Sequence, residues 1–342
     1  MKLRDYVIRR LLLLIPVLLG VSVLLFALTR LAGDPATLYI TERMTDRQVE
    51  QIREKYGFNQ PIWIQYEKWF VGALGGDLGV SKSFGNRPVT EAIIQKFPAT
   101  FELTVASLSI AIFIGIPLGV SSAKRRDRPV DHATRIFALA GVSIPIFWLG
   151  ILLQFLFYYE LRWLPFGGRF DSTSANPVYF SVPTRTYFYT IDSLLALNGA
   201  AFFDAIVHLI LPAIALSYAS TAVITRLMRS SMLEVLGAEY IKTARAKGLS
   251  EKVVVRKHAV RNALIPTTTV IGLSFGGLLG GAILTETIFN WPGLGKWSAD
   301  AILGADRAAI LGFTLLAAVV YVVVNLIVDL MYAYLDPRIR LE

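Results

Sequence analysis

Two glycine-containing stretches are the first places in this sequence where chemistry could occur. Gly76 to Ser83, GDLGVSKS, is similar to the phosphate-binding pattern G-x-x-x-x-G-K-S/T, but Ser81 replaces the second glycine. Gly293-Leu294-Gly295 lacks the third glycine of a dinucleotide-binding loop. Neither has the preceding strand that both kinds of loop require. We interpret the first as a chance match and the second as a turn, and we expect no nucleotide site here, so any driving ATPase would be a separate chain.

Other reactive side chains are few and scattered. The chain has no cysteine, which excludes thiolate nucleophiles and cysteine-based metal sites. His132, His208 and His258 are isolated in the sequence. Asp329 lies near one end of an apolar run, from where its carboxylate can reach the membrane interface. We therefore expect no catalytic, cofactor-binding or metal site. The scarcity of charge also disfavours a proton-driven carrier, although a sodium-coupled carrier could use backbone carbonyls.

A charged, helix-prone segment, Glu239 to Pro266, separates two long apolar runs. Its first part has an apolar stripe at helical spacing, formed by Leu233, Leu236, Tyr240, Ile241 and Ala244. Glu239 is placed to pair with Lys242. Gly248 is expected to stop the helix at a tight turn, and Ser250 to cap the next helix. The segment predicts two helices joined at a sharp corner.

Small residues mark this corner. Ala244, Ala246 and Gly248 alternate with Arg245 and Lys247, a pattern that would allow the surface of another protein to approach closely. The alternative is an amphipathic hairpin that binds anionic lipid.

The elements that position these residues are apolar helices. Of the 342 residues, 54% are hydrophobic and the mean hydropathy is +0.55, values typical of a membrane protein. Six runs are about the ~20 residues needed to cross a bilayer. They are 11–29, 103–123, 136–159, 205–225, 264–284 and 307–332. The first run is longer than the apolar core of a secretory signal, so we expect an uncleaved helix.

The charge distribution predicts the topology. Lys and Arg are concentrated in 124–135 and 226–261, as in cytoplasmic loops, whereas 31–100, 161–204 and 285–306 lack a basic excess. The net charge of +9 is therefore explained without nucleic acid. We predict an all-α polytopic membrane protein with six transmembrane helices, both termini cytoplasmic, and a polar extracytoplasmic loop region between the first two helices.

Two features of that loop region and one of the fifth span have local signatures. Thr45 to Gln48 is a capping box that predicts a short helix ending at Gly57. Pro61 to Phe70 is aromatic and amphipathic, which fits either a membrane-interface helix or the core of a small domain. The fifth span has glycines at four-residue spacing, which favour close helix packing: Gly272, Gly276 and Gly280, with Gly277 and Gly281 on an adjacent face.

A set of motifs resembles the permease subunits of ABC importers, in the dipeptide, oligopeptide and nickel branch. The first is T-A-R-A-K-G-L at Thr243 to Leu249, followed by H-A-x-R-N-A-L-x-P at His258 to Pro266. The others occur in the same order as in that branch: Gly76-Asp77-Leu78-Gly79-x-Ser81, Arg87-Pro88-Val89, Pro98-Ala99-Thr100, Ser143-Ile144-Pro145-x-Phe147-Trp148, Glu286-Thr287-Ile288-Phe289-x-Trp291-Pro292-Gly293-Leu294-Gly295 and Asp336-Pro337-Arg338. The similarity extends over essentially the whole chain, and its N-terminal arrangement is similar to the first of two paired permeases.

The resemblance implies a domain organisation and a set of partners. Residues 1–30 would form the N-terminal transmembrane helix, 31–100 the extracytoplasmic loop region, and 101–342 the core permease domain with a cytoplasmic coupling loop at 226–263. The partners would be a homologous permease, two cytoplasmic ABC ATPase subunits or domains that carry ATP and Mg, an extracytoplasmic substrate-binding protein, and membrane lipid. This chain itself would hold no cofactor, and it would lie in the plasma (inner) membrane of a prokaryote.

The resemblance also assigns two groups of residues. The ATPase-coupling residues would be Glu239, Tyr240, Thr243, Ala244, Arg245, Ala246, Lys247, Gly248 and Leu249. An extracytoplasmic turn near the translocation path would contain Glu286, Phe289, Trp291, Pro292, Gly293 and Gly295. The alternative for the turn is a surface loop with an interfacial tryptophan. The general importer signature E-A-A-x-x-x-G has Lys242 at its first position here, so Glu239 is a candidate contact only.

The expected function is a non-enzymatic transport subunit that imports di- or oligopeptides. Oligosaccharide, nickel or glutathione are alternative cargoes for the same machinery. Two alternatives belong to other classes: an ion-coupled secondary carrier that works alone, and a membrane-anchored structural or lipid-binding protein.

Overall fold

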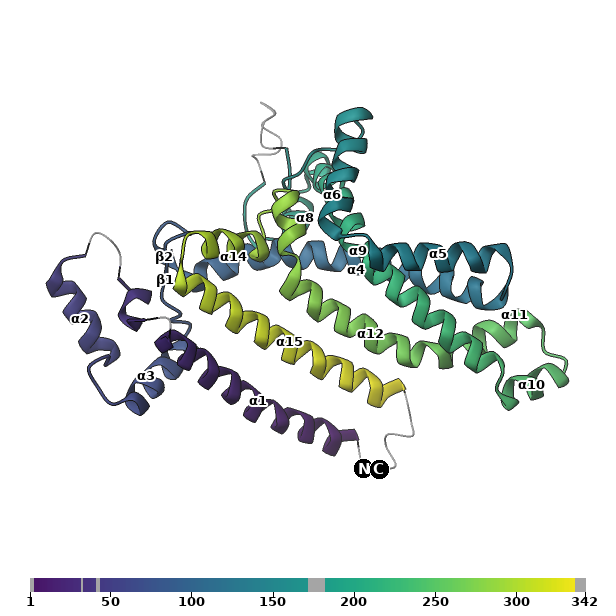
Figure 1. The fold of residues 1–342 in the computed structure, drawn as a ribbon, viewed down its shortest axis with the longest axis horizontal. Coiled ribbons are helices and arrows are strands. Elements are labelled where there is room, and N and C mark those ends of the chain that lie inside the picture. The colour runs from purple at the N-terminus through teal and green to yellow at the C-terminus, as the bar shows by residue number, and fades with distance from the viewer. Residues whose placement is uncertain (1–2, 32, 41–43, 172–181, 336–342) are drawn as a thin grey trace.

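The computed structural model describes residues 3–31, 33–40, 44–171 and 182–335. Within these ranges the regular structure is helical apart from one short antiparallel hairpin, β1 (Val80–Ser81) with β2 (Arg87–Pro88). Helices α1, α15 and α12 run side by side, and α10 and α11 lie at one end of the molecule (Figure 1). The motif Asp336 to Arg338 falls outside the described residues.

In the described part of the chain, five helical segments are long and apolar enough to cross a membrane. They are α1 (Leu3–Leu31), α4 (Val89–Lys124), α9 (Gly199–Leu236), α15 (Arg307–Leu335), and a continuous segment made of α11 (Glu251–Val253), the π-helical turn η3 (Val254–Ala259) and α12 (Val260–Gly281). These segments contain five of the six predicted spans almost completely, which confirms an all-α polytopic membrane fold.

The predicted third span, 136–159, is broken in its middle. Helix α5 (Pro129–Ser143) meets α6 (Ile146–Gln154), which continues into the π-helical turn η2 (Phe155–Glu160), at 102°. Pro145 causes the break because its ring disfavours helical backbone at the preceding residue, and Ile144 is extended at φ −80°, ψ 122°. The number of spans is six only if this bent pair counts as one, so the count of six and the location of the termini stay predictions.

The region between the first two spans contains η1 (Pro35–Leu38), α2 (Asp46–Tyr56) and α3 (Ile62–Leu74). The capping box of α2 is confirmed, with the Thr45 backbone N–H donating to Gln48 Oε1 at 2.8 Å, and α2 ends at Gly57 as predicted. Tyr66 of α3 packs edge-on against Phe26 of α1, while Trp63 stays exposed. The aromatic face of α3 therefore contributes a contact with α1 and also leaves apolar surface for a membrane interface.

The stretch that is similar to a phosphate-binding loop has a structural role. Its serines hold the hairpin against the start of α15: the hydroxyls of Ser81 and Ser83 donate to Asp306 Oδ2 at 2.7 and 2.8 Å. The backbone N–H of Ser83 donates to the same oxygen at 2.9 Å. A hairpin follows Gly79 in place of the helix that a phosphate loop requires.

Two linking regions complete the described chain. On the side of α2 and α3, α13 (Ile283–Ile288) and α14 (Leu294–Leu303) connect α12 to α15, and α8 (Tyr189–Leu195) precedes α9. At the opposite end, α10 (Glu239–Ala246) and α11 connect α9 to α12 (Figure 1). The first residues of α1 and the last residues of α15 lie toward the α10 end of the molecule (Figure 1).

Glycines mediate the closest contacts between helices. A Cβ on Gly115 or Gly119 of α4 would lie 2.9 Å from Ile224 Cγ2 or 2.7 Å from Met228 Cβ of α9. A Cβ on Gly141 of α5 would lie 2.6 Å from Ala222 of α9. Small residues at these positions let the backbones approach closely. None of these three glycines was predicted from the sequence as a packing residue.

The glycines of the predicted fifth span differ in how closely other helices approach them. A Cβ on Gly272 would lie 1.9 Å from Val328 of α15, and one on Gly276 would lie 3.4 Å from Val324. Gly277 has no atom within 4 Å of such a Cβ. Gly280 and Gly281 end α12, and their surroundings fall outside the described part of the chain.

We predict that Gly272→Ala destabilises the protein. The new methyl group would overlap the stiff, β-branched Val328, and overpacking of this kind costs about 1–3 kcal/mol. Thermal unfolding in detergent should therefore begin at a lower temperature. Gly277→Ala on the same helix is the control. Equal unfolding temperatures for the two variants would contradict the contact.

Candidate functional site

The first candidate region is the corner formed by α10 and α11. The inner face of α10 is fixed to the rest of the chain because Ile241 and Ala244 are buried. They pack with Met228 and Met232 of α9 and with the adjoining apolar residues of η3. Burial of these side chains, rather than helix propensity, stabilises so short a helix. Helix α10 is thus an attached part of the molecule.

The outer face of α10 is open to solvent. Eight of the nine residues predicted to couple to an ATPase are exposed: Glu239, Tyr240, Thr243, Arg245, Ala246, Lys247, Gly248 and Leu249. Ala244 differs, because its methyl group is only 8% exposed and faces the chain's own core. The expectation that Ala244 belongs to a docking surface is therefore wrong, and its small size serves packing inside the chain.

Side chains on both arms of the corner fix its shape. Gly248 has φ +77°, a left-handed conformation that favours glycine, and a Cβ there would meet no atom within 4 Å. Arg245 Nε and Nη2 donate to the two Glu251 oxygens at 3.1 and 2.9 Å, which ties α10 to α11. Glu239 pairs with Lys242 at 2.7 Å, as predicted. The predicted helix, turn and second helix are all present.

A buried charge cluster, which was not predicted from the sequence, lies beside the corner. Asp131, at the start of α5, is fully buried and accepts hydrogen bonds from Arg229 Nε at 2.6 Å and Nη2 at 2.7 Å. Ser122 of α4 also donates to Asp131, and the backbone N–H of Asp127 does so at 3.0 Å. The cluster joins α4, α5 and α9. The signal in the sequence was an acid within the first turn of a helix that begins at a proline.

We predict that Asp131→Asn destabilises the protein strongly. Removal of one partner from a buried ion pair leaves the other charge uncompensated, which typically costs about 3–5 kcal/mol. The stabilities of Asp131→Asn, Arg229→Gln and the double variant can be compared by thermal unfolding. The double variant should lose less stability than the two single variants lose in sum, because the charges interact with each other. Additive losses would show that the pair contributes no coupling.

The second candidate region is the turn between α13 and α14, at the opposite end. The carboxylate of Glu286 is fully buried behind this turn. It accepts from the Thr100 hydroxyl at 2.7 Å and from the Lys296 backbone N–H at 2.8 Å. Burial raises the pKa of Glu286 above its usual range, against the opposing effect of these hydrogen bonds. Thr100 Oγ1 also accepts from the backbone N–H of Leu294 at 2.8 Å.

The aromatic residues of the turn are also buried. Trp291 is fully buried, and its indole N–H donates to the Ala99 carbonyl at 2.8 Å. Phe289 is equally buried, against α9 and the α6 region. The alternative of a surface turn with an interfacial tryptophan is therefore wrong, because the ring fills space between α4 and α9. The structure joins the predicted Pro98-Ala99-Thr100 motif directly to the turn.

Glycine is required in this turn by the closeness of its neighbours. A Cβ on Gly293 would lie 2.5 Å from the Glu286 oxygens and from Thr100 Oγ1. A Cβ on Gly295 would lie 2.8 Å from the backbone of Ile283. Pro292, between Trp291 and Gly293, lines a surface pocket. The six predicted turn residues thus lie together, and their position relative to a translocation path stays a prediction.

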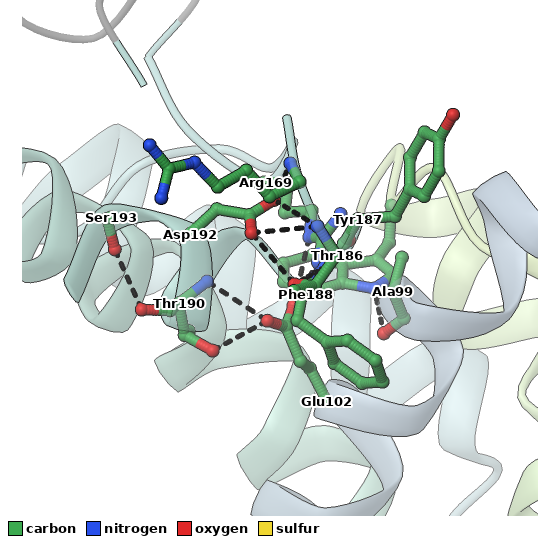
Figure 2. A network of polar contacts seen from close by, with 11 residues as sticks. Ala99, Glu102, Arg169, Thr186, Tyr187, Phe188, Thr190, Asp192 and Ser193 are labelled. Atoms are coloured by element: carbon green, nitrogen blue, oxygen red, sulfur yellow. Dashed lines mark hydrogen bonds and ion pairs between the residues drawn. The ribbon is translucent and has the colours of Figure 1, made fainter. Parts of the chain in front are cut away.

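A polar network on the same side holds the loop before α9, and the sequence analysis did not find it (Figure 2). Glu102 of α4 accepts from Arg169 Nε at 3.0 Å and from the Thr190 N–H and hydroxyl at 3.0 and 2.6 Å. Asp192 accepts from the backbone N–H of Thr186 at 2.9 Å. Glu102 directly precedes the predicted span 103–123, and this could have indicated a buried ion pair, because an acid next to an apolar span is costly unless it is paired.

We predict that Glu286→Gln destabilises the turn. An NH2 group would replace one carboxylate oxygen and would face another donor, the Lys296 N–H or the Thr100 hydroxyl. A buried donor without an acceptor costs about 1–3 kcal/mol. Thermal unfolding should shift downward, and limited proteolysis should cut the turn faster. Glu91→Gln, which removes an exposed ion pair at the start of α4, is the control and should change stability by less than about 1 kcal/mol. Equal effects of the two changes would contradict the role of Glu286.

The described residues do not include a group of three or more histidines or acids that could hold a metal ion. The clusters at Asp131, Glu102 and Glu286 are saturated by hydrogen bonds from the protein itself. They position helices and loops, and none of them exposes a nucleophile to a cavity.

Comparison with known proteins assigns the chain to a family. Residues 115–341 match the family described as binding-protein-dependent transport system inner membrane component, and residues 3–104 match the N-terminal region of such membrane components. The chain is 46% identical over 327 residues to the probable D,D-dipeptide transport system permease protein DdpB of Escherichia coli, covering 95% of this chain and 94% of that one. It is 43% identical to the dipeptide transport system permease protein DppB of Alkalihalophilus pseudofirmus, covering 98% and 99%, and 41% identical to the oligopeptide transport system permease protein AppB of Bacillus subtilis, again covering 98% and 99%. The chain therefore belongs to the inner-membrane components of binding-protein-dependent ABC transport systems, as a multi-pass permease subunit and not an enzyme.

Proposed function

We propose that the chain forms, with a homologous permease subunit, the translocation path of an ATP-driven importer for di- and oligopeptides. Relatives that are matched over 94–99% of their length are named as dipeptide or oligopeptide transport permeases, and this supports a peptide as the cargo. We propose as further partners an extracytoplasmic binding protein that delivers the peptide and two cytoplasmic ABC ATPases that hold ATP and Mg. The α10 end would then be cytoplasmic, together with both termini.

The observation that carries this proposal is the division of α10 into two faces. Ile241 anchors its inner face, and its exposed outer face offers Tyr240, Arg245 and Lys247 to a partner. An ATPase that binds the outer face would move the apolar cluster of α9, α10 and η3 as a unit, because packed interiors transmit displacement. ATP binding would thereby bias the chain between inward and outward states.

The charge cluster beside the corner would extend this movement to further helices. Arg229 lies on α9, close to the apolar cluster that holds α10, and its ion pair with Asp131 links α9 to the start of α5. Ser122 links the same carboxylate to the end of α4. Rigid connections of this kind let a domain shift as a body.

The test is reconstitution with defined components. A tagged chain purified from its native membrane is expected to bring a homologous permease and ATPases with it. Vesicles that contain this assembly should take up a labelled dipeptide only when ATP and the binding protein are both present. Uptake by this chain alone, driven by an ion gradient without ATPase subunits, would instead support a secondary carrier and contradict the proposal.

We predict that Gly248→Gln lowers peptide uptake and the stimulation of ATP hydrolysis by loaded binding protein. A long side chain at the tip of the corner would obstruct the ATPase, and the left-handed backbone would be strained. Both activities should fall about tenfold, which corresponds to a loss of about 1.4 kcal/mol of coupling.

Gly85→Gln is a matched control. Gly85 also has a positive φ, +69°, and open space around a Cβ, but it lies in the hairpin on the other side. This variant carries the same backbone strain without touching the corner, so its uptake should stay close to wild type. Equal losses in both variants would mean that strain, and not docking, explains the effect.

A further inference from the structure

A pocket of about 300 Å³, lined by charged and aromatic residues, opens beside the turn between α13 and α14. Its wall is formed by α4, the hairpin turn at Ser83 and Phe84, the loop that contains Arg169, the turn at Asn290 to Gly293, and α14. It lies on the side of the molecule opposite to α10, which is the extracytoplasmic side under the proposed topology. Its volume lies at the lower limit for small-molecule sites.

Three cations and the acid Asp300 line this pocket, and one of the cations has no ion-pair partner among the described residues. Arg169 is bound to Glu102, and Lys296 approaches Asp300 at 3.5 Å. Lys96 of α4 is partly buried, and no carboxylate of the described residues lies within 4.0 Å of its ammonium group. Like charges held together in a partly buried site repel one another, which is a cost that a bound anion would remove.

A second lining residue also lacks an acceptor. Trp297 is 4% exposed, and its indole N–H has no hydrogen-bond partner among the described residues. Buried N–H groups normally find acceptors, but this nitrogen has almost no accessible surface and therefore lies behind the wall of the pocket. The wall itself combines Lys96, which has no ion-pair partner among the described residues, with the rings of Phe84 and Phe170.

We propose that this pocket binds the terminal carboxylate of the transported peptide, with Lys96 as its counter-ion. This inference rests on the proposed peptide cargo and extends it to a subsite on this chain. A carboxylate is the one anionic group that every unmodified peptide carries, whatever its side chains. The aromatic walls would accept varied side chains without hydrogen-bond selection, which suits a carrier of many sequences.

The turn makes the pocket a stable site. Gly293 and Lys296 line it, and both are fixed from behind by Glu286 and Thr100. A preorganised wall avoids the cost of ordering side chains when the ligand binds. Since Glu286 already accepts three protein hydrogen bonds, one from Thr100 and two from backbone N–H groups, its carboxylate does not take the place of a ligand at Lys96.

The experiment compares a labelled dipeptide with its C-terminal amide in vesicles that contain the complete importer and saturating binding protein. Lys96→Gln should reduce uptake of the free acid about tenfold, the effect of one charge-assisted hydrogen bond, and leave uptake of the amide unchanged. Lys96→Arg should retain the preference for the acid. Lys82→Gln, at an exposed lysine in the nearby hairpin, is the control and should behave as wild type.

Four outcomes would overturn the inference, and they are distinguishable. Equal loss for acid and amide would show that Lys96 does not read the carboxylate. If Lys96→Gln raises the concentration of ligand-free binding protein that is needed to stimulate ATP hydrolysis, then Lys96 pairs with an acidic side chain of the binding protein and not with the peptide. If the wild-type importer takes up no peptide, the proposed function fails and this inference with it. If the wild type transports peptide and Lys96→Gln is unchanged, only this inference fails.

Discussion

Close contact between α4 and α9 is the constraint on which the other parts of the structure depend. Gly115 and Gly119 bring the two backbones together within these spans, where lipid offers no hydrophobic force between helices and packing must provide the attraction. The clusters around the buried carboxylates of Glu102, Asp131 and Glu286 each include a residue of one of these two helices. Thr100, Glu102 and Ser122 lie on α4, and Arg229 lies on α9. The glycine contact therefore sets the distance across which these side chains can meet.

The charges are arranged so that burial is compensated locally. Glu102 and Asp131 are each matched by an arginine and by hydroxyl or backbone donors. Glu286 is hydrogen-bonded by neutral donors alone, and its burial raises its pKa. The clusters lie toward the two ends of the bundle, and its centre is joined by small residues. This distribution keeps ionised groups near water while fixing the loops that carry the functional regions.

Sequence reasoning found the elements that have local causes. Apolar run length predicted the spans, Gly248 and Gly57 predicted helix ends, and the capping box predicted α2, because each depends on residues close together in the chain. The break at Pro145 was readable in principle but was treated as part of a span. The buried state of Trp291 and the pairing of Glu102 with Arg169 depend on residues 192 and 67 positions apart, and no local pattern encodes such contacts. The wrong assignment of Ala244 has the same origin, since spacing shows that a residue is small but does not show which side it faces.

The two-faced corner has a consequence for how such systems diversify. Residues that hold α10 to its own chain, such as Ile241, differ from those that meet solvent, such as Tyr240 and Lys247. Under the proposed role, recognition of an ATPase and transmission of its motion are carried by separate sets of side chains. Substitutions on the outer face can therefore change which motor is accepted while the mechanical linkage stays intact, so that permeases and ATPases can exchange partners over evolution without rebuilding the machine.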